Sequence, residues 1–487
     1  MEDKKIVDKV LEFASLIKYN GEKRDFIEKA IKKFLIDPKD DFSIEDEIKK
    51  IFKDSGFLDK KEVKRTLSNF FTIDEAFEMY DYILTIDAGI EDLLFYLIEK
   101  YTRYDHNLKK EIGVTVTDLI KFSTTLENIY NYDLIAGNYN LNPNIFNSME
   151  EAYYPYNLQY PDEKGKEVSR MASFITKDAL LIFLKKGLKE MDMENIVKNI
   201  DFLLGTLSFS REDIIKDPKI RFQEKPLFRI DKENYILINE VHLFFGLPYR
   251  LDSLLNNYSW YTDKKGKNFE RVAFKVLGEI NGNKRIGGEF FSKVNYGSYE
   301  SDGLINFKDT SWFVELKGRI PRSDSFKGDL KSVSKDIEKG VEEAEVQALR
   351  AIKEAEKKGK LGVREVRQNK GILIITEGMY PNLNQNTVMD FKRKDENYPR
   401  YIISFLTLME ILRQHDIYYL KQFLEWRSDP EMPIYCFSEL DYWDYFTSMQ
   451  SGLDKKEGYE LSKKNHNKII FNGKRFNAPK FIKNLDK

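Results

Sequence analysis

The sequence is poor in the residues that build disulfides and zinc sites. Its 487 residues include one cysteine, Cys436, and four histidines. A single cysteine excludes a disulfide framework and is typical of a reducing cytoplasm. The histidines lack the short spacings of zinc ligands, which argues against a zinc site or a histidine-metal nuclease; they are His106, His242, His415 and His466.

Long apolar runs and nucleotide-binding loops are also missing. No stretch approaches the roughly eighteen apolar residues of a membrane span, and the charged start MEDKKIVDK lacks the apolar core of a signal peptide. The sequence has neither a glycine-rich phosphate loop followed by lysine and serine or threonine nor a dinucleotide fingerprint. We therefore expect a cytoplasmic protein with no membrane partner.

The overall charge argues weakly against nucleic-acid binding, because the net charge is −2 and such proteins are often basic. The cations are nevertheless unevenly distributed, with ten Lys or Arg against four Asp or Glu in residues 454–487. Such patches would neutralise phosphates, although an ordinary solvated surface is the alternative. A second set of candidate phosphate-binding cations is Arg319, Arg322, Lys357, Lys358, Lys360, Arg364, Arg367 and Lys370.

The pattern of apolar residues predicts an α+β protein with several domains. Residues 1–225 show apolar residues every three or four positions, which predicts a mostly helical recognition or regulatory region. PLFRIDKENYILIN, within 226–261, predicts a hairpin followed by a linker. Residues 262–415 predict an α/β core, and 416–487 a small C-terminal extension that ends in the basic tail.

The segment ESDGLINFKDTSWFVELKGR, residues 300–319, predicts a tight hairpin. Two short runs rich in β-branched and aromatic residues flank a turn expected at 309–310. Lys308 would then pair with Ser311 across this turn.

Three charged residues meet at the open end of this hairpin. The expected register places Asp302 opposite Lys317 and diagonal to Glu315. The apolar residues 312–314 indicate a covered strand, in which an unpaired charge is costly. A cross-strand ion pair would explain Lys317, but two neighbouring carboxylates still require a cation.

This combination of SDGLI, a turn and VELKG resembles the core motif of the PD-(D/E)XK nucleases, which share the restriction-endonuclease-like fold. The resemblance implies an αβββαβ core over residues 262–415. Ser301 stands where the family motif has proline. The elements expected around the hairpin are a helix at 268–280, a strand at 284–294, a long helix at 332–358 ending at Gly359, a strand at 370–378 and a helix at 401–415.

The resemblance also implies roles for individual residues. Asp302 and Glu315, with the carbonyl of Leu316, match the positions that bind magnesium, for which manganese would substitute. Lys317 matches the catalytic lysine, which would either activate the attacking water or stabilise charge on the phosphate. Two further positions match residues that some members add to the site: Glu270 in the first helix and Gln347 in the second.

The sequence therefore predicts a magnesium-dependent endonuclease, with DNA favoured over RNA as substrate and restriction or phage defence as a role suggested by analogy alone. The helical region would mediate regulation, a homodimer or the binding of a partner protein. Two alternatives remain open. One is a non-catalytic nucleic-acid-binding or assembly module with an inactive nuclease fold, and the other is a scaffold whose three charged residues form an ion-pair network.

Overall fold

The chain folds into two compact units, Met1–Asp54 with Leu97–Leu254, and Ser55–Tyr96 with Leu255–Lys487. The described ranges contain no helix with the length and apolar character that a membrane span requires. The computed structural model describes residues 2–19, 24–39, 41–44, 46–47, 90–130, 173–187, 193–218, 220–320, 330–378, 397–414, 417–428, 439–450, 468–471 and 474–477.

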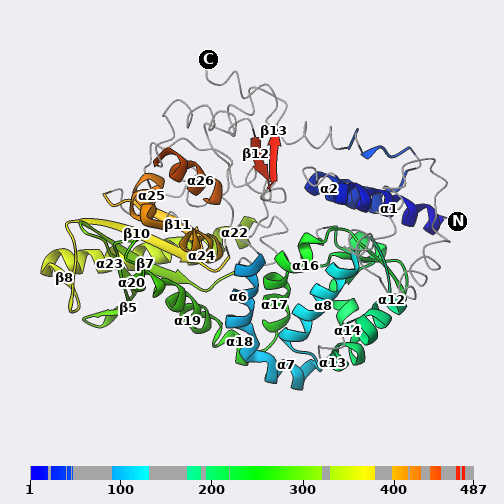
Figure 1. Ribbon diagram of the computed structural model, residues 1–487, viewed down its shortest axis with the longest axis horizontal. Helices are drawn as coiled ribbons and strands as arrows, with labels where there is room; N and C mark the ends of the chain where they lie inside the picture. The colour runs from blue at the N-terminus through cyan, green and yellow to red at the C-terminus, as the bar shows by residue number, and fades with distance from the viewer. Residues whose placement is uncertain are drawn as a thin grey trace, which may run out of the picture. The chain divides into compact units, whose positions relative to one another are not determined.

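Helices make up most of the first unit (Figure 1). Their apolar faces are buried; in α2 (Arg24–Ile36), for example, Ile27 and Ile31 are almost fully covered. The other helices are α1 (Glu2–Tyr19), α6 (Ile90–Tyr101, divided between the units after Tyr96), η2 (Thr102–Tyr104), α7 (Asp105–Ile112), α8 (Val116–Tyr130), α12 (Lys177–Ile182), η4 (Phe183–Gly187), α13 (Glu194–Lys198), α14 (Ile200–Leu207), α15 (Arg211–Lys216), α16 (Val241–Phe245) and α17 (Leu247–Leu255).

A small sheet completes the first unit. It has the strand order β1-β4-β3-β2, and its strands are β1 (Phe174–Thr176), β2 (Ser208–Phe209), β3 (Leu227–Arg229) and β4 (Asn234–Leu237). The hairpin predicted within 226–261 is confirmed as β3 and β4. The prediction for residues 1–225 omitted β1 and β2, because segments of two or three residues are too short to show an alternating pattern.

The second unit centres on a five-stranded mixed sheet with the order β11-β10-β7-β6-β5 (Figure 1). Antiparallel pairing joins β5, β6 and β7, whereas β7, β10 and β11 run parallel. This combination of helices with mixed sheets confirms the α+β class. The strands are β5 (Glu289–Tyr296), β6 (Tyr299–Asn306), β7 (Thr310–Lys317), β10 (Asn369–Thr376) and β11 (Arg400–Ser404).

A long helix packs on β7 and β10. It consists of α22 (Leu330–Ile337), the π-helical turn η5 (Glu338–Glu342) and α23 (Glu343–Lys358), and it ends at Gly359 as predicted. A buried ion pair of 2.7 Å between Arg400 and Glu345 fixes α23 to β11.

The remaining elements of the second unit are α18 (Ser259–Thr262), α19 (Lys265–Leu277), α20 (Glu279–Gly282), β8 (Lys360–Leu361), β9 (Arg364–Glu365), α24 (Phe405–Arg413), η6 (Ile417–Tyr419), α25 (Leu420–Arg427), α26 (Glu439–Gln450), β12 (Lys468–Phe471) and β13 (Lys474–Asn477).

Two predicted elements in this unit begin later than expected. The strand expected at 284–294 begins at Glu289, because a turn with a hydrogen bond from Ile286 N to Asn283 O precedes it. The helix expected at 401–415 begins only after Ser404, whose hydroxyl accepts a hydrogen bond from Thr407 N and caps the helix. The preceding run RYIIS contains Tyr401 and two isoleucines, which favour a strand, and it pairs with β10 as a buried strand.

Gly246 occupies a position where the backbone leaves no room for a side chain. A Cβ atom there would lie 1.7 Å from the carbonyl oxygen of Gln223. We expect Gly246→Ala to lower the free energy of unfolding by about 3 kcal/mol or more, measured by urea denaturation. Gly205→Ala in α14 is the matched control, because no atom lies within 4 Å of its added Cβ. It should raise stability by about 0.5–1 kcal/mol, and equal stabilities of the two variants would contradict this account.

Candidate functional site

Asp302 lies where β6 separates from both neighbouring strands. The β6–β7 ladder ends at Gly303 and Val314, and the β5–β6 ladder omits Asp302 while keeping the same register on either side. Across from Asp302, Lys293 has a φ of 52°, a left-handed conformation that non-glycine residues rarely adopt. The Asp302 side chain replaces a backbone partner, since its Oδ2 accepts a hydrogen bond of 2.7 Å from Leu316 N.

Asp302 and Glu315 form a carboxylate pair, in which Asp302 is partly buried and Glu315 is buried. Glu315 is only 2% exposed, and its carboxyl group is in hydrogen-bonding contact with that of Asp302. Burial raises the pKa of Asp302, and burial together with the Asp302 carboxylate raises the pKa of Glu315 to about 9. The pair therefore retains a proton at neutral pH unless a cation takes its place.

The side chain of Lys317 points to the long helix. Its Nζ donates a hydrogen bond of 2.5 Å to Oε1 of Gln347 on α23. Lys317 makes no ion pair with any carboxylate in the described part of the chain, although its charge lowers the pKa of both Asp302 and Glu315. The structure thus brings Gln347, which the resemblance assigned to the site, into contact with Lys317 at the end of β7.

Glu270 is half-buried on α19 and contributes to the same electrostatic field. Burial, and then the charge of Asp302, raise its pKa. Lys293 partly offsets this effect. Glu270 is therefore close enough to interact with the carboxylate pair through its charge.

The donor atoms at this site suit a hard divalent cation. The described residues contain no group of three or more His, Cys, Asp or Glu side chains that could hold a metal. Two carboxylates are available, however, and the carbonyl of Lys317 accepts a hydrogen bond from Glu377 N next to β10. Because carbonyls alternate along a strand, the carbonyl of Leu316 points to the opposite side, towards Asp302. Two carboxylates and a carbonyl fit magnesium, which keeps several of its waters.

The predicted register of the hairpin was wrong by two residues. Ser311 pairs with Asn306 and not with Lys308, and the turn lies at Lys308 and Asp309. Both turn residues are charged and exposed, whereas Thr310 is buried within β7. The turn therefore forms one residue earlier than expected, because this leaves the charged pair in water.

This shift changes which charged residues face each other. It brings Asp302 level with Glu315 and not with Lys317. An offset of two residues leaves every side chain on its original face of the sheet. The expected gathering of the three residues at one end of the hairpin therefore persists with different partners.

Several predicted phosphate-binding cations already have partners within the protein. Arg364 lies over the ring of Phe291 at 4.4 Å, and Lys357 and Lys360 are exposed. Arg322 and most of the basic tail lie outside the described residues. Four cations pair with carboxylates: Arg319 with Asp336 (2.8 Å), Lys358 with Glu354, Arg367 with Glu365 (3.5 Å) and Lys370 with Glu356 (3.9 Å).

The sequence analysis named Lys357 but missed Arg350 and Lys353, which belong to the same basic face of α23. Arg350, Lys353 and Lys357 follow one another at spacings of three and four, which places them on one side of the helix. They line a hollow of about 620 Å³ together with the β5–β6 turn, residues 296–299. The spacing of the cations was readable from the sequence, but the turn that faces them was not.

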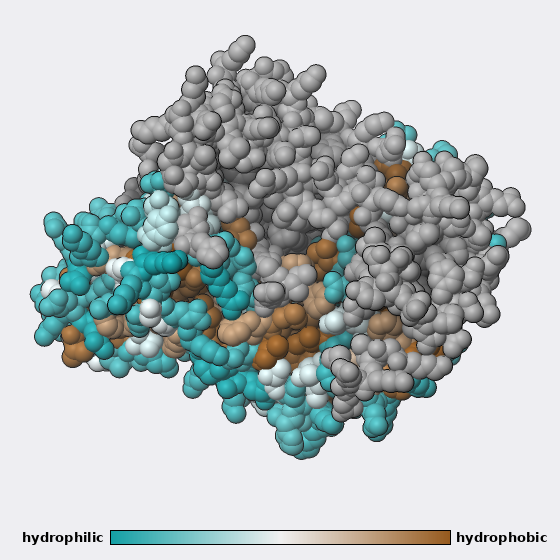
Figure 2. All heavy atoms as spheres, in the orientation of Figure 1, coloured by the Kyte–Doolittle hydropathy of each residue, from teal (hydrophilic) through white to brown (hydrophobic). Residues whose placement is uncertain are grey.

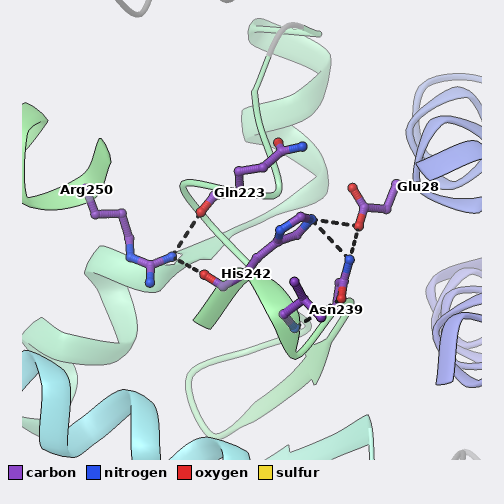
Figure 3. A network of polar contacts seen from close by, with 6 residues as sticks. Glu28, Gln223, Asn239, His242 and Arg250 are labelled. Atoms are coloured by element: carbon purple, nitrogen blue, oxygen red, sulfur yellow. Dashed lines mark hydrogen bonds and ion pairs between the residues drawn. The ribbon is translucent and has the colours of Figure 1, made fainter. Parts of the chain in front are cut away.

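A second buried polar cluster lies in the first unit (Figure 3). His242 Nε2 lies 2.8 Å from Oε1 of Glu28, and Asn239 Nδ2 donates to the same oxygen at 2.5 Å. Burial alone would raise the pKa of Glu28, but the charge and hydrogen bond of His242 and the hydrogen bond of Asn239 bring it below its ordinary value. The cluster connects α2 to the start of α16.

Arg250 stabilises the backbone beside this cluster (Figure 3). Its guanidinium donates hydrogen bonds of 3.0 Å to the carbonyls of Gln223 and His242, and one of 2.6 Å to the carbonyl of Leu243. Burial lowers the pKa of Arg250 to about 9. These contacts are those of a structural anchor, because they involve carbonyls of the protein itself.

Comparison of the chain with family models, with curated proteins and with solved structures found no match. Its function must therefore be argued from the chemistry of the site.

The raised pKa of Glu315 predicts that stability falls as pH rises in the absence of divalent metal. The folded state keeps a proton that the unfolded chain releases above about pH 4.5, so unfolding becomes more favourable between about pH 4.5 and 9. The slope should be at most about 1.4 kcal/mol per pH unit. Urea denaturation in EDTA at pH 5 to 8.5 measures this slope, and the slope should be smaller in Glu315→Gln. Equal slopes in the two proteins would show that Glu315 does not hold this proton.

Removing His242 should leave Glu28 as a buried charge without its main partner. We expect His242→Leu to lower the free energy of unfolding by about 3 kcal/mol at pH 7. The loss should shrink at pH 4, because without His242 burial raises the pKa of Glu28 and protonation then removes its charge. Urea denaturation of this variant and of a double variant that also carries Glu28→Gln tests the account. The double variant should recover part of the stability; a further loss would contradict the pairing.

Proposed function

We propose that this protein is a metal-dependent nuclease that hydrolyses phosphodiester bonds. The observation that carries the proposal is the buried pair of carboxylates, Asp302 and Glu315, with Lys317 two residues further along the same strand. Burial raises the pKa of both groups, and the charge of Asp302 raises that of Glu315 further, which favours a bound cation beside them.

The order of elements supports the same reading. A helix, three antiparallel strands, a long helix and a strand parallel to the third follow one another as α19, β5, β6, β7, α22 with α23, and β10. This is the order that the resemblance to PD-(D/E)XK nucleases implies. DNA is the favoured substrate because that family acts mainly on DNA, and a role in restriction or phage defence rests on the same analogy.

Each residue of the site has a task that its contacts suggest. The Leu316 N–H orients Asp302, and Asp302, Glu315 and the Leu316 carbonyl would hold the cation. A bound divalent cation would neutralise charge on the phosphate and lower the pKa of a coordinated water. Gln347 holds the Nζ of Lys317 in place, from where it can orient the attacking water or donate to a phosphate oxygen.

The contacts of Lys317 argue against a purely structural ion-pair network. In such a network the ammonium group would bind Asp302 or Glu315 directly. In the described part of the chain it binds the amide of Gln347 instead, and the two carboxylates remain in contact with each other. A stabilising network would not leave two buried acids side by side.

Isosteric removal of one charge tests the proposal. We expect Asp302→Asn to reduce cleavage by about a hundredfold or more, because the amide oxygen still accepts from Leu316 N but binds a cation poorly. Lys317→Ala should have an effect of similar size. The assay incubates purified proteins with plasmid, linear and single-stranded DNA and with RNA, in magnesium, in manganese and in EDTA.

Glu289→Gln is the matched control, because it removes an exposed carboxylate from the first residue of β5 in the same sheet. It should cleave like the wild type, and urea denaturation should show all variants folded. Equal cleavage by wild type and Asp302→Asn would place the activity elsewhere. Binding of nucleic acid without metal and without cleavage of any substrate would favour the non-catalytic module.

A further inference from the structure

A hollow next to the carboxylate pair combines aromatic rings with unpaired cations. It lies between the β5–β6 turn and α23, with a volume of about 620 Å³. Pockets of about 300–1,000 Å³ are of the size that takes small organic groups. Figure 2 shows mostly hydrophilic residues over α23, β8 and β5, with a few hydrophobic residues among them.

The turn presents two tyrosines to this hollow. Tyr296 and Tyr299 flank the two-residue turn, and their ring centroids lie 5.9 Å apart. Tyr296 is buried, whereas Tyr299 is 50% exposed and therefore accessible to a ligand. Arg350 lies over the Tyr299 ring at 4.6 Å and restrains it.

The helix supplies positive charge along the other wall. Arg350, Lys353 and Lys357 form no ion pair with a carboxylate of the described ranges, because the one acidic residue of this wall, Glu354, binds Lys358. Val346, 40% exposed, adds an apolar patch at the end of the wall nearer to Gln347. Rings, apolar surface and free cations together match a nucleotide better than a purely ionic ligand.

The hollow is adjacent to the proposed catalytic centre. Gln347, which binds Lys317, lies on the same helix, and the segment from Gln347 to Lys357 spans about 15 Å. Tyr296, the buried tyrosine of the hollow, also interacts with the carboxylate pair. Burial, and then the charge of Glu315, raise its pKa. A strand leaving the carboxylate pair along α23 would pass directly over these residues.

We propose that this hollow binds an unpaired nucleotide beside the phosphate that is cleaved, so that the preferred substrate is a nucleic acid with a single-stranded segment. The base stacks on the exposed ring of Tyr299, and Lys353 and Lys357 contact the adjoining phosphates. This inference rests on the proposed nuclease function. A paired base can contact the ring only after it is unpaired and unstacked, which has a free-energy cost, so blunt duplex should bind less tightly.

Binding in EDTA tests the hollow separately from cleavage. Fluorescence anisotropy measures the affinity of the full chain for single-stranded DNA, single-stranded RNA of the same sequence, blunt duplex and duplex with a single-stranded tail. Tyr299→Ala should weaken binding to single strands and tails by about five- to a hundredfold, and Tyr299→Phe should retain most of the affinity. Lys353→Ala should reduce the magnitude of the slope of log affinity against log salt concentration by about 0.7.

An abasic position identifies the base that contacts Tyr299. Moving one abasic site along the oligonucleotide should lower wild-type affinity about tenfold at a single position, and Tyr299→Ala should be insensitive there. Lys308→Ala is the matched control, because it removes an exposed lysine at the β6–β7 turn, at the opposite end of β6. Its affinity should stay within about twofold of the wild type.

Three results would overturn the inference. In the first, Tyr299→Ala binds single strands as tightly as the wild type does. In the second, the wild type binds blunt and tailed duplexes with equal affinity. In the third, poly-glutamate displaces the oligonucleotide as effectively as unlabelled oligonucleotide does, which would indicate an acidic peptide as ligand. If the wild type cleaves in manganese while Tyr299→Ala binds normally, only this inference fails. If Tyr299-dependent binding occurs without cleavage of any substrate, only the proposed nuclease function fails.

Discussion

The hydrogen bond from Leu316 N to Asp302 is the interaction on which the candidate site depends. It replaces a backbone pair at the place where β6 and β7 would otherwise continue side by side. The carboxylate thereby satisfies a buried amide and is held against Glu315 at the same time. The left-handed backbone of Lys293 on the other side of β6 places local strain at the same position, as is common at functional sites.

The sequence placed Asp302 and Glu315 on one face correctly because strand alternation is insensitive to an even error in register. The turn at residues 308–309 moved the pairing by two positions, and an even offset keeps Asp302 and Glu315 on one face. An offset of one would have separated them. The end of the long helix at Gly359 was equally readable, since the helical pattern stops there and glycine supplies the C-cap.

Other features depend on contacts that one segment alone does not encode. The run at residues 400–404 is apolar and precedes a helix, and only its pairing with β10 makes it a strand. The hollow requires Arg350 and Tyr299, which are far apart in the chain, to meet across the β5–β6 turn. The partners of the predicted cations were also hidden, because spacing alone does not show which carboxylate a lysine or arginine will reach.

The π-helical turn at Glu338–Glu342 sets the rotation of α23 relative to α22. Asp336 before the turn binds Arg319, and Gln347 after it binds Lys317, so both halves of the helix must face the same end of β7. If the same five residues formed a regular α-helix, each would advance by about 100°, more than a π-helical residue does, and the two halves would rotate against each other. The widened turn thus accommodates one residue more than a regular helix would between Asp336 and Gln347, and this lets both side chains keep their contacts.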